Sequence, residues 1–365
     1  MQIQEVISLL ESLASPVLQE SYDNAGLLTG TNSWNCSGIL VTLDATEEVI
    51  KEAVQKNCNL VVTHHPIIFG GLKKINGKNY VERTVITAIK NDVAIYAIHT
   101  NLDNVMNGVN GKIADKLGLT ERQWLSPKPS TLKKLFTFVP VDQIEKVRGA
   151  VFAAGAGHIG NYSETSFQSP GTGTFKAGKG ASPFVGKEGE RHYEPELKLE
   201  VIFPAHLQEK VVQALLDSHP YEEVAYDIIE IANSAGLAGS GLIGILENPQ
   251  PEGAFLALIK DRFKVPVIRH TKLTGNPVKR VAICGGAGSF LISNALRQGA
   301  DFYITADVKY HEFFDANGRM VIADIGHFES EQFTVELLHD ILKKKYHNFA
   351  VLKSDTPTNP VHYYY

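Results

Sequence analysis

The stretch that decides the fold is residues 61–71, which read Val-Val-Thr-His-His-Pro-Ile-Ile-Phe-Gly-Gly. Its first part is apolar and β-branched, as in a short buried strand. Pro66 and the glycine pair predict that this strand stops near His64. Open α/β sheets bind ligands at the carboxyl ends of their strands, so His64 and His65 fall where a site is expected. Neighbouring side chains on an extended chain point to opposite sides, so one metal ion held by both needs a bent backbone, whereas two ions do not. The alternative is a pair of surface histidines that closes a strand.

Strands and helices alternate on both sides of this stretch, which is typical of an α/β protein with a mostly parallel sheet. The first part of the chain has apolar strand patterns at residues 39–43, 60–63 and 93–98, and helical patterns at 3–13, 47–56 and 81–90. The same alternation returns with strands at residues 281–284, 301–305 and 320–324, and helices at 290–298, 308–317 and 337–345. The fold class is therefore α/β.

A different pattern interrupts this alternation. Strand patterns at residues 135–140, 197–203 and 224–231 surround helical patterns at 143–154 and 206–218, with a Gly/Ser/Thr-rich segment at 155–180. The order β-α-β-β-α-β is that of a ferredoxin-like α+β unit. The prediction is a first α/β half over residues 1–129, an inserted ferredoxin-like domain over 130–233, and a second α/β half over 234–365.

The two outer parts resemble each other. Residues 54–63 and 295–305 both read as a helix end, a turn and a strand that closes in threonine. The next strand in each part leads to a histidine with a carboxylate four residues later, His99 with Asp103 and His327 with Glu331. We expect two similar halves that face each other in one core, with chance resemblance as the alternative.

If the halves face each other, their strand ends converge on one metal-binding cleft. The candidate ligands are His64, His65, Asp103, His327 and Glu331, and Asp44, His99, Asp307 and His311 are expected nearby. Imidazole and carboxylate ligands suit zinc, iron or manganese, and five of them exceed the needs of one tetrahedral ion. We therefore expect two divalent metal ions, as in metal-assisted hydrolysis. For His327 and Glu331 the alternative is a polar pair at a helix start.

Composition narrows the class of protein further. In 365 residues, 44% are hydrophobic and 21% charged, which is ample for a globular core, and the formal net charge of -5 without a basic stripe argues against a nucleic-acid partner. The three cysteines lack metal spacing and suit a reducing compartment. No apolar run is long enough for a membrane helix and no signal peptide is evident, so we expect a cytoplasmic protein. The glycine-rich residues 285–289 are either a tight β-α turn or a contact for phosphate.

Four motifs together resemble the Nif-three-like family, also described as GTP cyclohydrolase type-2 homologues. They are Asp-Asn-Ala-Gly-Leu at residues 23–27, Thr-His-His-Pro-Ile-Ile-Phe at 63–69, His-Thr-Asn-Leu-Asp at 99–103 and Gly-His-Phe-Glu-Ser-Glu at 326–331. They occur in family order, and the resemblance covers nearly the whole chain. It implies a dinuclear metal site with the five ligands named above, a toroidal homohexamer, and an insert of the PII/CutA-like type found in long bacterial members. The segment from Thr305 to His311 departs from the usual family pattern, which makes roles for Asp307 and His311 less secure.

The resemblance implies a metal-dependent hydrolase that acts on a small molecule, a nucleotide or another phosphate-containing compound. A cyclohydrolase of this type adds water to C8 of guanine and opens the imidazole ring. Candidate catalytic residues are His99, as a proton shuttle or a partner that holds a ligand, and Asp307 and His311. The alternative is a non-catalytic metal-binding or regulatory scaffold whose insert senses a small molecule.

Overall fold

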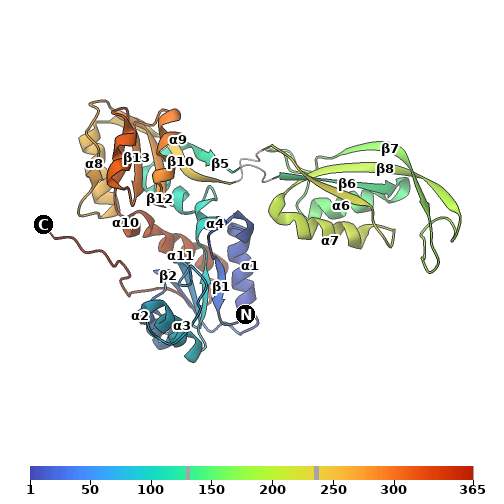
Figure 1. Ribbon diagram of the computed structural model, residues 1–365, viewed down its shortest axis with the longest axis horizontal. Coiled ribbons are helices and arrows are strands. Elements are labelled where there is room, and N and C mark those ends of the chain that lie inside the picture. The colour runs from blue at the N-terminus through green and yellow to red at the C-terminus, as the bar shows by residue number, and fades with distance from the viewer. Residues whose placement is uncertain (129–131, 234–237, 365) are drawn as a thin grey trace. The chain divides into compact units, whose positions relative to one another are not determined.

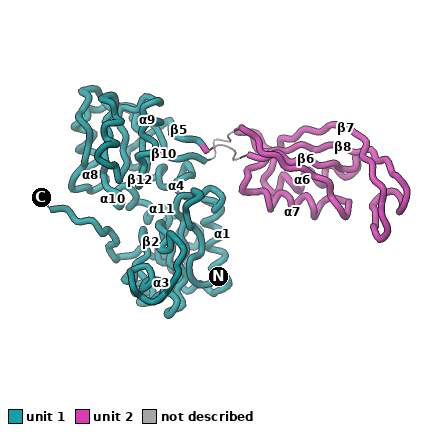
Figure 2. The backbone as a smooth tube through the Cα atoms, in the orientation of Figure 1, with its two compact units in different colours: residues 1–127, 238–365 teal, residues 128–237 magenta. Residues whose placement is uncertain are grey.

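The chain, seen in a computed structural model (Figure 1), is described over residues 1–128, 132–233 and 238–364, and it divides into two compact units (Figure 2). Unit 1 contains residues 1–127 and 238–365, and unit 2 contains residues 128–237. The predicted boundaries at 129/130 and 233/234 fall in or beside residues 129–131 and 234–237, which lie outside the described residues. Within the described ranges, no helix has both the length and the apolar character needed to cross a membrane.

The first sheet of unit 1 has five strands. In spatial order they are β1 (Gly26–Thr29), β4 (Ala94–Ala97), β3 (Leu60–His65), β2 (Ile39–Asp44) and β15 (Val351–Lys353). All neighbours are parallel except β1 and β4. The strand β3 lies at the centre and runs one residue further than predicted, to His65, and Pro66 follows it. Its first five residues are buried, because both faces of the sheet are covered.

The second sheet of unit 1 has six strands and differs from the prediction of a mostly parallel sheet. In spatial order they are β11 (Arg269–His270), β14 (Val321–Asp324), β13 (Phe302–Ala306), β12 (Val278–Ala287), β10 (Gly239–Gln250) and β5 (Leu119–Pro127). Only the pairings within β12, β13 and β14 are parallel, and the other three pairings are antiparallel. The strands β5 and β10, which flank unit 2 in the sequence, pair with each other directly, and β10 pairs in turn with β12.

Helices fill the space between the two sheets and cover their outer faces. The helices of unit 1 are α1 (Ile3–Leu13), α2 (Glu47–Gln55), α3 (Tyr80–Lys90), α4 (Thr100–Asp103), α5 (Val109–Leu117), α8 (Glu252–Phe263), α9 (Ile292–Arg297), α10 (His327–Glu331) and α11 (Phe333–Lys345). One continuous apolar core joins α1, α5, α8 and α11 to both sheets, while α2 and α3 cover the outer face of the first sheet. The predicted helix over 308–317 is instead a 3-10 segment, Tyr310–Ala316.

Unit 2 has the predicted order of a ferredoxin-like unit. Its elements are β6 (Leu132–Pro140), α6 (Ile144–Ala153), β7 (Phe167–Lys176), β8 (Arg191–Pro204), α7 (Gln208–Ser218) and β9 (Tyr226–Glu230). The sheet order is β7-β8-β6-β9, with every pairing antiparallel. Alternate residues of β6 and β8, such as Leu135 and Leu199, form a core with α6 and α7. The side chains between them point to the opposite face of the sheet.

Candidate metal centre

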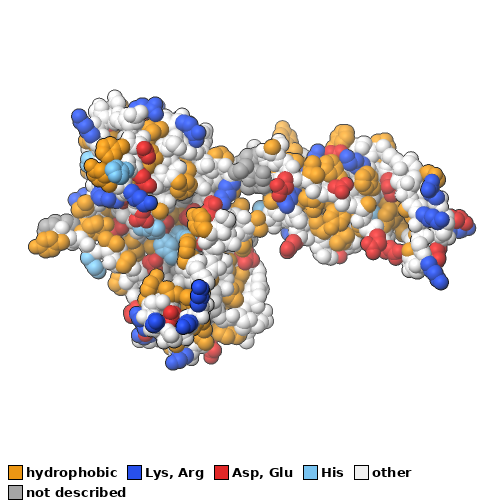
Figure 3. All heavy atoms as spheres, in the orientation of Figure 1, with side chains coloured by type: hydrophobic (Ala, Val, Ile, Leu, Met, Phe, Trp, Pro, Cys, Tyr) orange, Lys and Arg blue, Asp and Glu red, His pale blue; other side chains and the backbone are white. Residues whose placement is uncertain are grey.

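The five predicted ligands come from three places in unit 1. His64 and His65 end β3, Asp103 ends α4, and His327 and Glu331 begin and end α10. Together with His99, their ligand atoms form three overlapping groups within which all atoms lie within 4.8 Å of one another. These groups are His64 with His65 and His99, His65 with His327 and Glu331, and His64 with Asp103 and Glu331. The structure therefore brings residues more than two hundred positions apart into one cluster, and histidine side chains are visible in a recess of unit 1 (Figure 3).

Glu331 lies between two parts of this cluster, and only 3% of its surface is exposed. Its Oε2 atom lies 2.9 Å from Nε2 of His65 and 3.1 Å from Nε2 of His327. Its Oε1 atom lies 3.8 Å from Nε2 of His64, which is itself 3.7 Å from Oδ1 of Asp103. The two oxygens of one carboxylate thus face two different sets of ligands.

The donor set fits metal ions, because two polar atoms at its centre have no other partner. Nε2 of His64 and Oδ1 of Asp103 are buried, and neither has a hydrogen-bond partner in the described structure. Buried polar atoms are normally hydrogen-bonded, and burying them without a partner costs free energy. A bound cation would remove this cost for both atoms. His64 is completely buried, and its Nδ1 lies 2.8 Å from the carbonyl oxygen of Ile98. A proton on Nδ1, donated to that carbonyl, leaves the Nε2 lone pair free for a cation.

The other three imidazoles are held in the same way, each by a carboxylate. Nδ1 of His65 lies 2.7 Å from Asp44, Nδ1 of His99 lies 2.7 Å from Asp23, and Nδ1 of His327 lies 2.6 Å from Asp307. Such carboxylates fix the orientation and tautomer of metal-binding histidines. Asp44 in turn accepts a hydrogen bond of 2.7 Å from the hydroxyl of Thr358, near the end of the chain.

The electrostatics show how strongly these groups interact. Burial lowers the pKa of His65, but Asp44 and Glu331 outweigh burial and raise it to about 10. Burial likewise lowers the pKa of His327, and Glu331 and Asp307 raise it to about 9. Burial raises the pKa of Asp103, and the nearby Glu331 raises it further. The carboxylates of the cluster thus favour positive charge at this place, as a site for cations requires.

The predicted catalytic candidates fall in three different places. His99 belongs to the ligand cluster itself, and 15% of its side chain is exposed. Asp307 is at the edge and holds His327. His311 is exposed and packs against Tyr310 and Phe314, and it belongs to none of the three ligand groups.

The glycine-rich residues 285–289 begin within the last three residues of β12 and pack directly against the cluster. The amide of Gly285 donates to Asn110, and the amide of Gly286 donates to the hydroxyl of Ser330, so two of the amides expected to hold a phosphate are already used. Gly286 has φ of +62°, and a Cβ atom there would lie 2.3 Å from Oε1 of Glu331. Glycine at this position therefore gives the ligand carboxylate its space.

Sequence reasoning missed some of the supporting residues. Asp23 and Ser330 occur in the four motifs without a role of their own, and Thr358 lies in none of these motifs. Thr358 lies 314 positions from the Asp44 it contacts, so no local pattern reveals the pairing. The position of Asp23 in the loop before a short strand is a signal in the sequence, but the same pattern is typical of a turn.

The fold and the cluster together indicate the class of protein. It is an α/β protein with a candidate site for more than one metal ion, built from histidines and carboxylates between two sheets. The profile of the Duf34/NIF3 family (NGG1p interacting factor 3) matches residues 1–360. The chain is 41% identical over 362 residues to a Halalkalibacterium halodurans protein and 38% identical to a Bacillus subtilis protein, each named "GTP cyclohydrolase 1 type 2 homolog", with 98% of this chain and 97% of each relative covered. It therefore belongs to the Duf34/NIF3 family.

Solved structures support the same fold. A Bacillus cereus protein related to NIF3 is 38% identical and superposes with a TM-score of 0.85, covering 100% of this chain and 99% of that one. A Staphylococcus aureus protein with 28% identity gives a TM-score of 0.77 over 100% of this chain and 99% of its own. The mixed α/β fold with several sheets is thus shared across these relatives.

Proposed function

We propose that the chain binds two divalent metal ions and acts as a metal-dependent hydrolase on a nucleotide or another phosphate-containing small molecule. The observation that carries this proposal is the placement of Glu331, whose two oxygens face two separate groups of ligands. A carboxylate so placed can bridge two cations. Zinc, iron and manganese suit the donor set, since it contains imidazole and carboxylate but no thiolate among the described residues.

When bound, paired divalent ions polarise substrate oxygens and lower the pKa of coordinated water. The protein's own residues supply the rest. His64, Asp103 and Oε1 of Glu331 would hold one ion, and His65, His327 and Oε2 of Glu331 the other. Asp44 and Asp307 orient the imidazoles of His65 and His327. His99, which Asp23 orients, offers a further imidazole nitrogen for holding a ligand or moving a proton.

The names of the relatives support GTP as the first substrate to test. Ring-opening hydrolysis of guanine requires water to be added at C8, which suits a centre that activates water. We also propose, from the family resemblance, that the chain forms a homohexamer and that unit 2 is an insert of the PII/CutA-like type. The similarity of residues 54–63 and 295–305 supports a duplication of the two α/β parts. For the insert there is also support from the structure, in the all-antiparallel β-α-β-β-α-β order of unit 2.

The test is a screen of metal-loaded protein against GTP, other nucleotides and phosphoesters. For ring opening of GTP we expect one product heavier by one water, and for a phosphoester two products whose masses together exceed that of the substrate by one water. His64→Ala should be inactive and His311→Ala should still turn over, because His311 is an exposed histidine outside the cluster. Turnover retained in His64→Ala would refute the catalytic role of the cluster.

A second candidate is a non-catalytic metal-binding scaffold. It is favoured by the presence in unit 2 of a separate cavity that shares no residue with the metal cluster. A scaffold would bind metal through the same ligands but would show no turnover in the screen.

A further inference from the structure

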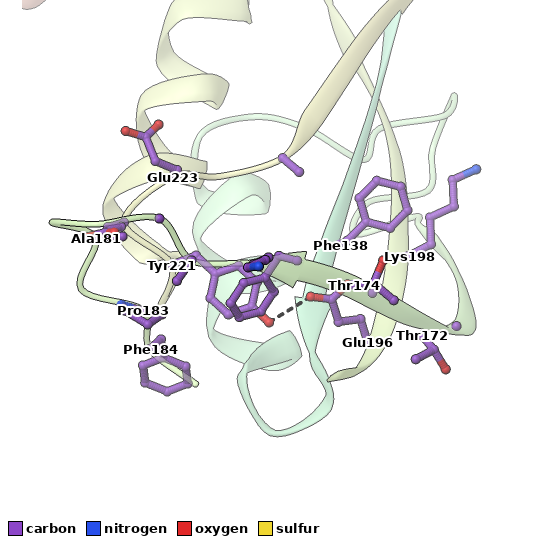
Figure 4. A pocket seen from close by; sticks show the side chains of 18 of the residues that line it. Phe138, Thr172, Thr174, Ala181, Pro183, Phe184, Glu196, Lys198, Tyr221 and Glu223 are labelled. Carbon is purple, nitrogen blue, oxygen red and sulfur yellow. Dashed lines mark hydrogen bonds between the residues drawn. The ribbon is translucent and has the colours of Figure 1, made fainter. Parts of the chain in front are cut away.

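Unit 2 contains a cavity of about 720 Å³, shown in Figure 4. The cavity lies against β6, β7 and β8, on the side chains that alternate with those packed on α6 and α7. Aromatic and charged side chains line it together, among them Phe138, Phe175, Phe184, Tyr221, Glu196 and Lys198. This volume suits a small organic molecule.

Glu196 is the unusual residue of this cavity, because it is a carboxylate with only 7% of its surface exposed. Its Oε1 atom accepts a hydrogen bond of 2.8 Å from the hydroxyl of Tyr221 (dashed in Figure 4). Burial and the neighbouring Glu196 raise the pKa of Tyr221, so its hydroxyl keeps the proton that it donates. No Lys, Arg or His among the described residues forms an ion pair with Glu196. Burying a carboxylate without a positively charged partner costs free energy, because the charge loses its contact with water. This cost favours the binding of a ligand that carries a positive charge.

The chain makes room for Glu196 with a glycine. A Cβ atom on Gly173 would lie 2.1 Å from Oε2 of Glu196. Any other residue at position 173 would therefore displace this carboxylate. The backbone of Gly173 needs no left-handed conformation, which leaves this space as the reason for glycine. The motif Gly-Thr-Gly-Thr-Phe at residues 171–175 thus contributes both the space for Glu196 and the ring of Phe175.

Aromatic rings from separate elements surround the carboxylate. The ring of Tyr221 lies 6.3 Å from that of Phe175 on β7 and 6.3 Å from that of Phe184 in the loop before β8. The same loop is held in place where the amide of Ser182 donates to Glu222, at 2.9 Å. Residues 221–223 of the stretch His-Pro-Tyr-Glu-Glu (219–223) therefore line the cavity, and Glu222 also holds the loop that carries Phe184.

Lys198 does not neutralise Glu196. Its Nζ atom lies 3.0 Å from Glu200 and 4.4 Å from the centre of the Phe136 ring, and neither of these residues lines the cavity. Lys176, Glu222 and Glu223 also line the cavity, but all three are exposed to solvent. The buried charge of the lining is therefore that of Glu196, which favours a positively charged ligand.

We propose that this cavity binds a small, flat organic cation of the amidinium or guanidinium type. The cation's N–H groups would donate to Glu196, as in charge-assisted pairing of a planar cation with a carboxylate, and its flat body would lie among the rings of Phe138, Phe175 and Tyr221. This site is separate from the metal centre and does not depend on the proposed hydrolase activity.

The experiment is isothermal titration calorimetry of the full chain with benzamidine and arginine as probes, and with benzoate as a control that matches benzamidine in shape but carries the opposite charge. We expect saturable binding of at least one of the two cations at one site per chain, and no binding of benzoate that depends on Glu196. Absence of binding by both cations would refute the proposal.

Variants place the binding in this cavity. Glu196→Gln should weaken cation binding about tenfold to a hundredfold, because it removes the charge but keeps an acceptor for Tyr221. Glu194→Gln is the matched control, since Glu194 lies on the same strand, pairs with His192 and does not line the cavity. Phe175→Ala should also weaken binding, and Phe167→Ala should not, because Phe167 is an exposed ring at the other end of β7. Unchanged affinity in both Glu196→Gln and Phe175→Ala would show that the cation binds elsewhere and would overturn the proposal.

Discussion

Two buried glutamates, one in each unit, show how the partners of a carboxylate decide what it can bind. Glu331 in unit 1 is 3% exposed and faces imidazole nitrogens, while Glu196 in unit 2 is 7% exposed and faces aromatic rings and one tyrosine hydroxyl. Imidazoles are themselves metal ligands, so the first site suits a metal ion. Aromatic rings attract a cation only through their faces, so the second suits an organic cation.

A third buried glutamate, Glu52, differs from Glu331 and Glu196 in the partners of its carboxylate. Glu52 on α2 is 8% exposed, and its carboxylate accepts hydrogen bonds from Lys56, Ser354, Asp355 and Thr356. Residues of the chain itself therefore supply the hydrogen-bond donors of this carboxylate. We therefore expect Glu52 to contribute to stability alone, and the other two glutamates to contribute to binding.

The largest effect is expected for Glu331→Gln. The change removes the charge that the two groups of ligands share. Metal content measured by elemental analysis should therefore fall from the proposed two ions per chain to one or fewer. At a hundredfold excess of metal over the dissociation constant, binding raises the free energy of unfolding by about 2.7 kcal/mol. Most of this metal-induced increase should be lost in the variant.

Melting curves with and without metal provide the measurement for Glu331→Gln. The metal-induced shift in melting temperature is the quantity to compare, because the variant also loses contacts with His65 and His327 in the metal-free state. His311→Ala is the control and should keep the full shift. Equal shifts in the wild type and in Glu331→Gln would show that Glu331 is not a ligand.

The next largest effect is expected for Glu52→Gln, which should lower the free energy of unfolding by about 1–3 kcal/mol at neutral pH. Burial raises the pKa of Glu52, but hydrogen bonds from Lys56, Ser354 and Thr356 outweigh burial and lower it from 4.5 to about 2. A carboxylate with a lowered pKa stabilises the fold above its unfolded-state pKa, and this contribution is lost as the pH falls through its folded-state pKa. The difference between wild type and variant should therefore shrink between pH 4.5 and about pH 2.

Urea unfolding at several pH values measures this difference. The metal-induced shift should be the same in Glu52→Gln and in the wild type, since Glu52 belongs to no ligand group. A difference in stability that stays constant down to pH 2 would contradict the assignment of the low pKa to Glu52.

A smaller effect is expected from the carboxylates that orient the imidazoles. Asp44→Asn should weaken metal binding about tenfold to a hundredfold, as is usual for residues behind metal ligands. Asp307→Asn should have a smaller effect, because the side chain of Asp307 is 53% exposed, against 31% for Asp44, and water can replace it. Metal titration of the two variants makes the comparison, and Thr358→Val tests the hydrogen bond to Asp44. A larger loss in Asp307→Asn would show that burial does not decide the strength of these contacts.

The residues predicted from the sequence as metal ligands lie together in the fold, whereas parts of the sheets differ from the prediction. The histidine–carboxylate spacing in His99–Asp103 and His327–Glu331 is local, so it could be read directly. The long strand β10 was not predicted, because its glycines weaken a strand pattern, and Gly241 has φ of +63°. The pairing of β15 with the first sheet joins residues more than three hundred positions apart, which no local pattern shows.

The cavity of unit 2 was beyond prediction for a similar reason. On β8, Glu196 alternates with apolar residues, so its position predicts a solvent-exposed side chain. Its burial comes from Gly173 on the neighbouring strand and from Tyr221 after α7. The motifs at residues 171–175 and 219–223, which contain Gly173 and Tyr221, can be seen in the sequence. Only the folded chain shows that they meet at one carboxylate.

The smallest effect on metal binding is expected for the removal of unit 2, which tests whether the two units bind their ligands independently. Residues 128–237 can be removed and replaced by a short Gly/Ser linker, because Pro127 on β5 pairs directly with Gly239 on β10. The linker would then close a hairpin between two strands that are already neighbours, so the second sheet should keep its order. We expect the shortened chain to bind the same amount of metal as the full chain, measured by elemental analysis, and to bind neither benzamidine nor arginine, measured by calorimetry. Loss of metal from a soluble, folded shortened chain would show that unit 2 supports the metal centre. Cation binding that survives the removal would place the organic cation in unit 1, and the contrast between Glu331 and Glu196 would fail.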